Sequence, residues 1–484
     1  MSNPSTRRPA AAGVHLLAAA LLAGCAPALE LTRPDPPVPP RFPLAVAAAS
    51  GTTLDASQVH WRSFFKDPRL HALIDSALEH NRDLRIAAAR VQEARAQWAL
   101  ARAEQWPSLL LFGRARLDRT YAENLSLEPA RRIDLNLSSS AFELDFFGRL
   151  ASLSDAARAS FLATEEARRA TELALVSQIA ELYLAQRQID ELLVRSRATV
   201  VSRQQTLEIL ARARDIGVST DLEFEQAQVQ LEAARAQRAQ FGLAQEQTAN
   251  LMQLLVGRMP PGLPEGLPLD RLVATHELTL GVPAEVLLMR PDVIAAEQRL
   301  AAAQANVKAA RAAFFPRVAL TANVGTASAG LLGLFKAGAW AFQPTVSIPL
   351  FDAGRNQAGW DLAKARELAV VAQYERTVQL AFREVADQLA ARASLALQAS
   401  AAERSLQAQQ HRLRIQRQRH EHGLGGFLEV LEAERELLAA EQAQVAVQRA
   451  QLEAVVGLYK ALGGGAPPAG ATASVALAGS ADGS

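Results

Sequence analysis

The stretch HGLGGFLEVLEAERELLAA, residues 422–440, interrupts a helical sequence with three glycines in four positions. Glycine costs about 1 kcal/mol per residue inside a helix, so Gly423, Gly425 and Gly426 predict a tight reversal between two helices. The stretch has a counterpart 206 residues earlier, IGVSTDLEFEQAQVQLEAA at 216–234, in which Gly217 matches Gly423. The chain therefore contains two similar helix turns at equivalent places.

The same spacing recurs elsewhere and indicates an internal duplication. Gly148-Arg149 recurs as Gly354-Arg355 at the offset of 206, and residues 83–107 resemble residues 292–316 at an offset of 209. Alanine-rich helices align with one another easily, so the Gly-Arg pairs and the turns are the stronger evidence for a duplication. Two such similar offsets predict one structural unit that is present twice.

Each half reads as the same series of elements. A helix of about 35 residues is expected to end before Pro107 and before Pro316, because the residue before proline disfavours helix. Two strand-like segments follow, and then a very long helix, about 149–216 or about 355–422. After the glycine turn a helix of about 35 residues returns.

The long helices carry the spacing of coiled coils. The seven-residue spacing of the first long helix joins Ile179, Gln186, Leu193, Val200 and Leu207, of which all but Gln186 are apolar, and apolar residues recur at the same spacing from Leu431 to Tyr459. This spacing predicts packing against neighbouring helices. At 1.5 Å per residue each long helix would extend about 100 Å, which is more than a globular domain needs.

Four short segments alternate apolar and polar residues with a period of two: 108–120, 132–138, 317–326 and 340–350. In the second, for example, Ile133, Leu135 and Leu137 share one face. An apolar face opposite a polar face is typical of a transmembrane β-strand, and half-buried hairpins are an equal alternative. Because about eight strands are the fewest that close a barrel, a barrel built from these four must be shared between subunits.

The N-terminus has the pattern of a bacterial lipoprotein signal. Arg7 and Arg8 precede the apolar segment 14–24, which is too short for a stable membrane span, and its end, LAGC, resembles a lipobox. Cys25 is the chain's single cysteine, and we expect it to carry a covalent lipid; a chance cysteine after an ordinary signal is the alternative. Ala26 replaces the aspartate that retains enteric lipoproteins on the inner membrane, which favours the outer membrane.

Composition and motifs argue against several other functions. The 51 basic and 50 acidic side chains nearly cancel, without the excess positive charge that nucleic-acid binding requires. The eight histidines show no metal-binding spacing, and GLGGF lacks the Lys-Ser/Thr pair of a phosphate loop. We therefore expect no enzyme activity, no nucleic-acid partner, and no cofactor apart from the lipid on Cys25.

Several motifs, taken in order, resemble one known family. They are WRSFFKDPRLHALIDSALEHNRDLRIAAARVQEARA (61–96), LLMRPDVIAAEQRLAAA (287–303), SIPLFDAGR (347–355) and GLYKALGGG (457–465). Together with the duplication and the lipobox, they make the chain similar to the outer-membrane efflux factors, the TolC-like proteins, and within them to the lipoprotein branch of the OprM type.

The resemblance implies a fold that is mainly α with a membrane β-barrel portion. Three copies of the chain would share one twelve-stranded barrel in the outer membrane, and their long helices would form a trimeric α-barrel across the periplasm. The implied partners are a periplasmic adaptor (a membrane fusion protein) and an inner-membrane pump of the resistance-nodulation-division type. The chain itself would be a passive conduit for drugs or other small toxic compounds.

On this basis the chain divides into five segments. They are a lipoprotein signal (1–24), a lipidated proline-rich tether (25–57), a first structural repeat (58–270), a second structural repeat (271–465) and a disordered tail (466–484).

The resemblance also assigns roles at the two turns. It places Leu428, Glu432 and Arg435 at the periplasmic constriction, and their spacing of four and three puts them on one helical face. The alternative is that Glu432 and Arg435 form an ordinary surface ion pair. The matching positions of the first repeat, Leu222, Gln226 and Val229, carry no charge, which favours an inner, gating hairpin and an outer hairpin.

The turns themselves are expected to dock the adaptor, through Gly217, Ser219, Thr220, Gly423, Gly425 and Gly426. Gly217 and Gly423 suit the left-handed position that ends a helix. Thr220 and Glu223 have the spacing of a capping box that begins the first return helix, and Gly426 takes the place of Thr220 in the second.

Two other functions are compatible with parts of this pattern. One is an outer-membrane conduit for protein secretion of type I, which works with an ABC-type exporter. The other is a lipid-anchored periplasmic coiled-coil scaffold without a pore, which leaves the four alternating segments unexplained.

Overall fold

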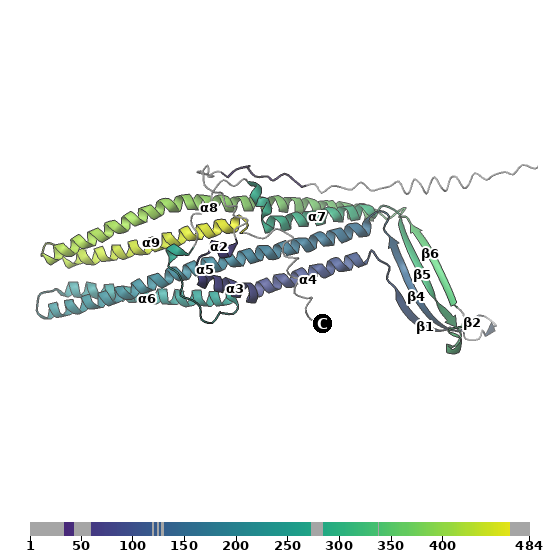
Figure 1. The fold of residues 1–484 in the computed structure, drawn as a ribbon, viewed down its shortest axis with the longest axis horizontal. Coiled ribbons are helices and arrows are strands. Elements are labelled where there is room, and N and C mark those ends of the chain that lie inside the picture. Colours follow the sequence, from purple (N-terminus) through teal and green to yellow (C-terminus); the bar gives the residue numbers. More distant parts are fainter. Residues whose placement is uncertain are drawn as a thin grey trace, which may run out of the picture. The chain divides into compact units, whose positions relative to one another are not determined.

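The structure, a computed structural model, describes residues 33–42, 60–118, 121–122, 125–126, 130–272, 284–336 and 338–464 (Figure 1). Cys25, the signal 1–24 and the tail 466–484 lie outside these residues. The chain forms two compact units, and each takes segments from both halves of the sequence. We call them the sheet unit (Met1–Asp35, Arg90–Glu165 and Ala295–Tyr374) and the hairpin unit (Pro36–Ala89, Glu166–Ile294 and Glu375–Ser484).

The sheet unit contains a four-stranded antiparallel sheet in the order β1-β4-β5-β6. Its strands are β1 (Leu110–Asp118), β4 (Ala130–Leu144), β5 (Arg317–Ser328) and β6 (Gly338–Ser347), and a small separate pair joins β2 (Tyr121–Ala122) to β3 (Leu125–Ser126). The four alternating segments of the sequence are therefore strands of one sheet, as predicted.

One face of this sheet is apolar and exposed. Its register aligns Leu111 with Leu137, Leu137 with Val324 and Val324 with Trp340 across all four strands. These four side chains are 71%, 40%, 56% and 79% exposed. Because side chains alternate between the faces of a strand, the predicted apolar face is confirmed, and among the residues that the structure describes none buries the row.

Strand β4 extends further than the alternation predicted, because it passes through a bulge. The register shifts between Ser139 and Phe142, where Ala141 has a positive φ of 51° and its N–H donates to Thr321 Oγ1 at 3.1 Å. The bulge moves the apolar positions of β4 from odd to even numbers. The strand therefore continues to Leu144, beyond the predicted end at residue 138.

The helices of the sheet unit begin or end beside the strands. Helix α4 (Arg82–Ala103) and helix α7 (Pro291–Ala312) each have 22 residues. The predicted helices of about 35 residues are therefore wrong in length. In the first half Asn81 separates α4 from α3 (Pro68–His80), because its extended backbone ends α3 and its Oδ1 accepts from Leu84 N at 2.9 Å.

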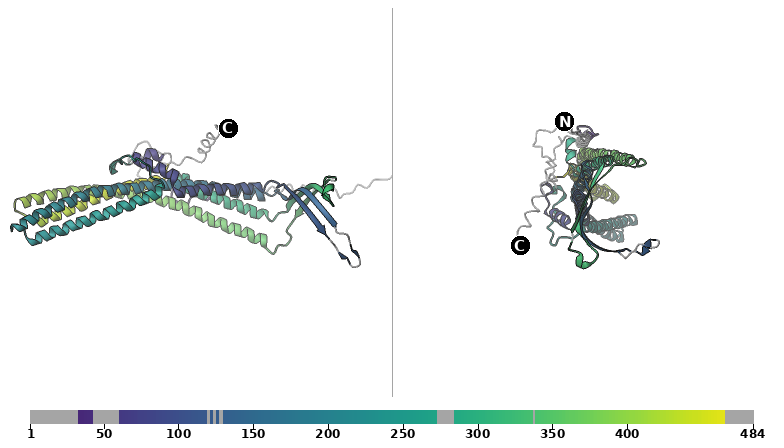
Figure 2. Two further views of the ribbon diagram at one scale, coloured as in Figure 1. Left: turned by 90° about the horizontal axis from the view of Figure 1, so that it is seen from below. Right: turned by 90° about the vertical axis from the view of Figure 1, so that its right-hand side faces the viewer.

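The hairpin unit consists mainly of two long helical hairpins (Figures 1 and 2). Helix α5 (Arg149–Asp215) turns into α6 (Asp221–Val256), and α8 (Arg355–Glu421) turns into α9 (Phe427–Ala461). The bounds of both long helices agree with the prediction to within one residue. The coiled-coil positions of α5 and α9 are buried or half-buried: Ile179 and Leu193 on α5 and Val445 and Leu452 on α9 are buried, whereas Val200 and Leu207 are half-buried.

Short elements pack around the other end of these hairpins. They are α2 (Trp61–Phe64), α3, and the 3-10 turns η2 (Leu269–Arg271) and η3 (Ala284–Met289). The buried carboxylate of Asp67 accepts from Tyr183 Oη at 2.6 Å and from Leu267 N at 2.9 Å. Burial, followed by this hydrogen bond, raises the pKa of the Tyr183 phenol. Among the described helices, none combines the length and the hydropathy that a membrane crossing needs.

Candidate functional site

The two helix turns end their long helices in the same way. Gly217 N donates to Arg214 O at 2.9 Å and Val218 N to Ala213 O at 2.8 Å. These two bonds define a Schellman motif, with Gly217 in the left-handed region at φ 73°. The second turn repeats the motif, since Gly423 (φ 72°) donates to His420 O and the next residue donates to Arg419 O. The left-handed glycines predicted from the sequence are confirmed.

The two turns differ in how the return helix begins. Thr220 Oγ1 accepts from Glu223 N at 3.3 Å, and Glu223 Oε2 accepts from Thr220 N at 2.9 Å, which completes the predicted capping box. Ser219 Oγ also donates to that oxygen, at 2.8 Å. These hydrogen bonds, led by the one from Thr220 N, lower the pKa of the Glu223 carboxyl.

The second return helix has no such cap. Gly426 occupies the N-cap position, where it makes no side-chain hydrogen bond. The turn is instead closed by side chains of α8, because Arg419 Nη2 donates to Leu424 O at 3.2 Å and the His420 ring lies 5.3 Å from the Phe427 ring. Both turns receive a side chain from the helix before them, since Arg214 of α5 lies 4.2 Å over the Phe224 ring. They differ because the first return helix also has a capping box formed by the turn's own residues.

Leu428, Glu432 and Arg435 lie together in the structure. They line a groove of about 240 Å³ between α6 and α9, with Leu431 beside them and Glu225, Gln226, Val229 and Gln230 on the opposite wall. Leu428 is 46% exposed, and Glu432 and Arg435 are exposed as well. The shared helical face expected from the spacing is therefore present.

The sequence did not indicate what faces these three residues. Two of their counterparts in the first repeat, Gln226 and Val229, form the opposite wall of the same groove. Arg435 Nη2 donates to Glu436 Oε1 at 3.0 Å. The alternative pair between Glu432 and Arg435 is therefore not formed in this structure.

A second polar cluster, which the sequence did not indicate, joins three helices near the same end. Glu434 of α9 pairs with Arg203 of α5 and, at 2.8 Å, with Arg417 of α8. The Arg203 side chain is only 6% exposed, whereas that of Arg417 is 54% exposed. The partners of Glu434 are distant in sequence, and in the first repeat Gln228 stands at its place, so the only signal was an acidic residue without a counterpart.

Further pairs continue this connection along α5 and α9. Arg195 lies 3.4 Å from Glu441, and Arg449 Nη1 donates to Gln188 Oε1 at 2.7 Å. The residue numbers of the partners on α5 increase while those on α9 decrease, which is the order expected of two antiparallel helices in contact. The two hairpins are therefore linked by polar contacts that begin at Glu434, next to the proposed constriction.

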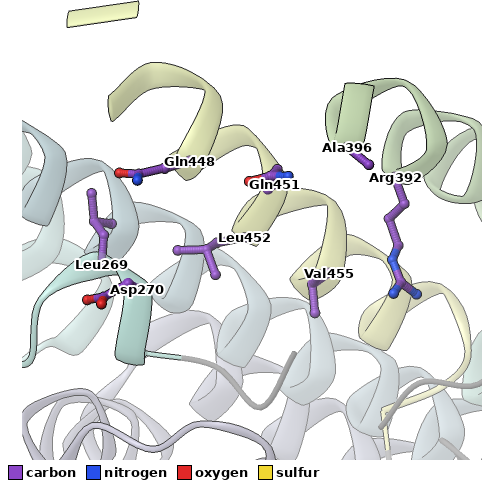
Figure 3. A pocket seen from close by; sticks show the side chains of 8 residues that line it. All are labelled: Leu269, Asp270, Arg392, Ala396, Gln448, Gln451, Leu452 and Val455. Carbon is purple, nitrogen blue, oxygen red and sulfur yellow. The ribbon is translucent and has the colours of Figure 1, made fainter. Parts of the chain in front are cut away.

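A cavity of about 380 Å³ lies elsewhere in the hairpin unit (Figure 3). It is lined by Leu269 and Asp270 of η2, Arg392 and Ala396 of α8, and Gln448, Gln451, Leu452 and Val455 of α9. Figure 3 shows the Arg392 side chain extending from α8 toward the part of α9 that carries Val455. Burial lowers the pKa of Arg392. Throughout the described residues, no group of three His, Cys, Asp or Glu side chains is placed to hold a metal ion.

Comparison with known proteins identifies the family. The pattern of the family described as outer membrane efflux protein matches residues 73–258 and 282–464. The chain belongs to the outer membrane efflux protein family. This efflux protein is 39% identical over 460 residues to the solvent efflux pump outer membrane protein SrpC of Pseudomonas putida, a match covering 93% of this chain and 97% of that relative. It is 40% identical over 447 residues to the cation efflux system protein CusC of Escherichia coli, covering 92% and 97%.

Solved structures agree with this assignment. A crystal structure of CusC matches the efflux protein with a TM-score of 0.82 and 40% identity, over 90% of this chain and 99% of that one. The open state of the MtrE outer membrane channel of Neisseria gonorrhoeae matches with a TM-score of 0.82 and 36% identity, over 90% and 97%. The predicted fold class, the location in the outer membrane and the function as an efflux channel are confirmed.

Proposed function

We propose that the protein is the passive outer-membrane conduit of a tripartite efflux system and acts as a homotrimer. The observation that carries this proposal is the exposed apolar row of Leu111, Leu137, Val324 and Trp340, on a sheet with two open edges. In the described sheet β1 pairs with β4 alone and β6 with β5 alone. A neighbouring copy satisfies both edges when its β1 pairs with β6, and three copies then give twelve strands with the apolar row toward lipid.

The tether supports the proposal that Cys25 carries the lipid. Arg33, the first described residue, donates through Nε to Tyr374 Oη at 3.0 Å, and its Nη2 lies 3.5 Å from Glu297. From Tyr374 back to Arg355, the first residue of α8, the helix extends about 28 Å. The eight steps along the chain from Cys25 to Arg33 reach about the same distance when extended. The lipidated thiol is therefore able to reach the end of α8 that adjoins the sheet.

Leu428, Glu432 and Arg435 are proposed as the periplasmic gate. In a trimer each would become a ring of three side chains, so Leu428 would narrow the pore by apolar contact. The charged rings would add an electrostatic barrier, because like charges repel at close range. Their exposure and their common groove support this role. Opening would require the second hairpin to move away from α5, to which Glu434 connects it.

The two turns are proposed as the adaptor-docking sites. Gly217, Thr220, Gly423 and Gly426 are exposed, and Ser219 and Gly425 are partly exposed. The proposed partners are a periplasmic adaptor and an inner-membrane pump of the resistance-nodulation-division type, which supplies the energy. The chain itself performs no catalysis in this scheme.

The proposed cargo consists of small toxic compounds. Relatives at 39–40% identity are named for solvent, toluene and cation efflux, which favours this class over secreted proteins. Deleting the gene should increase the susceptibility of the cell to solvents, drugs or metal ions and leave protein secretion unchanged. The opposite pattern would support the type I secretion conduit instead.

Two measurements test the conduit itself. The full-length protein, extracted from outer membranes, should migrate as a trimer that dissociates on heating, and its circular dichroism should contain a β contribution. In planar bilayers it should conduct ions. A monomer that forms no channel would contradict the proposal and favour the coiled-coil scaffold.

A further inference from the structure

The turn between β5 and β6 presents large apolar side chains. Residues 329–336, here called the β5–β6 turn, follow the end of β5 that is remote from α7 (Figure 1). Leu331, Leu332 and Phe335 are 74%, 96% and 83% exposed. Turns at the ends of strands are usually polar, so three such side chains in five residues need an explanation.

The β5–β6 turn has a defined shape. It contains the 3-10 helix η4 (Leu331–Gly333). Gly333 N donates to Gly330 O at 3.1 Å, Leu334 N to Leu331 O at 3.2 Å and Lys336 N to Gly333 O at 3.1 Å. Because these backbone bonds hold the turn, the exposure of its apolar side chains follows from a specific conformation.

The turn folds onto the apolar face of the sheet. Thr326 Oγ1 donates to Leu334 O, and Ser328 Oγ accepts from Gly330 N at 3.3 Å. Thr326 and Ser328 lie two and four residues after Val324, so their side chains share its face. Val324 belongs to the exposed apolar row, since it pairs with Leu137 and Trp340.

Two further contacts agree with this placement. Leu334 is only 8% exposed, so the turn directs one apolar side chain inward and three outward. Gly333 lies so close to Ser328 that an added Cβ would come within 2.3 Å of Ser328 Oγ. The β5–β6 turn therefore extends the apolar surface of the sheet and does not lie on its polar face.

We propose that the β5–β6 turn is a membrane anchor, whose Leu331, Leu332 and Phe335 insert at the boundary between headgroups and acyl chains in the outer leaflet. This inference rests on the proposed function, in which the apolar face of the sheet contacts lipid. Exposed Lys336 follows the apolar cluster and is placed to meet lipid phosphate groups, because lysine extends its charge toward the interface. The turn thereby fixes the height of the strands in the membrane.

Depth-dependent fluorescence quenching tests the anchor. The full-length protein carrying Leu332→Cys is labelled with an environment-sensitive fluorophore and reconstituted in phosphatidylcholine vesicles that contain lipids brominated just below the headgroups. Label bound to unsubstituted protein is subtracted as background. We expect the label at 332 to lose about half of its emission in brominated vesicles and to be protected from aqueous iodide.

Two control positions separate the outcomes. Phe342→Cys, on the apolar face of β6 and 61% exposed, should be quenched by bromine, and Val218→Cys, at the first helix turn, should not. An unquenched label at 342 contradicts the proposed function itself. Quenching at 342 without quenching at 332 overturns only the anchor. In that case, access of iodide to the label at 332 would place the turn in water. Protection of this label from both quenchers would place the turn against a second copy of the chain.

Discussion

The two helix turns end alike and begin differently. Both close α5 and α8 with a Schellman motif around a left-handed glycine, Gly217 or Gly423. Only the first return helix starts with a capping box, through Thr220 and Glu223. The two copies of the duplicated unit therefore share the backbone conformation of the turn and differ in the capping of the helix that follows it.

The two hairpins also differ in their charged residues. The second hairpin carries Glu432, Glu434 and Arg435 where the first has Gln226, Gln228 and Val229. Glu434 pairs with Arg417 inside the second hairpin and with Arg203 of α5 outside it, so the second hairpin is held partly by a contact with the first. A hairpin held from outside can be released by breaking a few polar contacts, which suits a gate better than a self-contained turn does.

The largest expected effect comes from Glu434→Ala. It leaves Arg203 buried without its carboxylate, which costs about 3 kcal/mol. We expect amides of residues 427–440 to exchange hydrogen about 100-fold faster, with little change in the first hairpin. The matched control is Glu232→Ala, which removes a pair with Arg235 that is about half exposed and should cost less than about 0.5 kcal/mol. Equal exchange in the two variants would contradict a connection specific to the second hairpin.

Replacing the left-handed glycines tests what the turns share. Gly217→Ala and Gly423→Ala should each destabilise their turn by about 1 kcal/mol, because an L-residue is strained at positive φ. No atom lies within 4 Å of the added Cβ in either case, so the two costs should be equal in local hydrogen exchange. Gly242→Ala, inside α6 and equally open, is the control and should stabilise its helix. Unequal costs at 217 and 423 would show that the two reversals are not equivalent.

Exchanging the caps tests what the turns do not share. Thr220→Ala removes the capping box and should destabilise the start of α6 by about 1 kcal/mol. Gly426→Ser should stabilise the start of α9 by about 0.3 kcal/mol, because Glu429 stands three residues later, as Glu223 does after Thr220. Nothing crowds a Cβ at Gly426, and its φ of −74° is unstrained. Hydrogen exchange of the amides in the first helical turn of α6 and of α9 measures the two changes in stability. The two changes must have opposite signs.

The smallest effect is a difference in pH dependence. Hydrogen bonds lower the pKa of Glu223 in the folded turn, so its contribution is present above the ordinary carboxyl pKa of about 4.3. It is lost as pH falls through the lowered value. Amides at the start of α6 should therefore lose protection in acid, and Glu223→Gln should abolish this dependence. An unchanged pH profile in that variant would show that another group is responsible.

Much of the fold follows from local patterns in the sequence. The long helices end within one residue of the prediction, because Gly-Arg pairs and glycine turns mark their ends. The strands and their apolar face follow from a period of two. The capping box was predicted because Thr220 and Glu223 interact over three residues.

The features that the sequence did not indicate depend on distant partners. Asn81 breaks a helical sequence because its Nδ2 donates to Leu255 O at 2.8 Å, a contact across 174 residues. Arg203 and Glu434 are 231 residues apart, and no local rule pairs them. For the same reason the sequence placed Leu428, Glu432 and Arg435 on one face without indicating that Gln226 and Val229 lie opposite.

Single-channel recording tests most directly whether the charges of the second hairpin control the pore. The full-length protein and its variants are compared in planar bilayers. Glu432→Ala and Arg435→Ala should each raise the conductance or the open probability, whereas Gln226→Ala and Val229→Ala, on the facing wall of the groove, should leave both unchanged. Unchanged conductance and open probability in both charge variants, or an equal increase in all four, would contradict control of the pore by these charges.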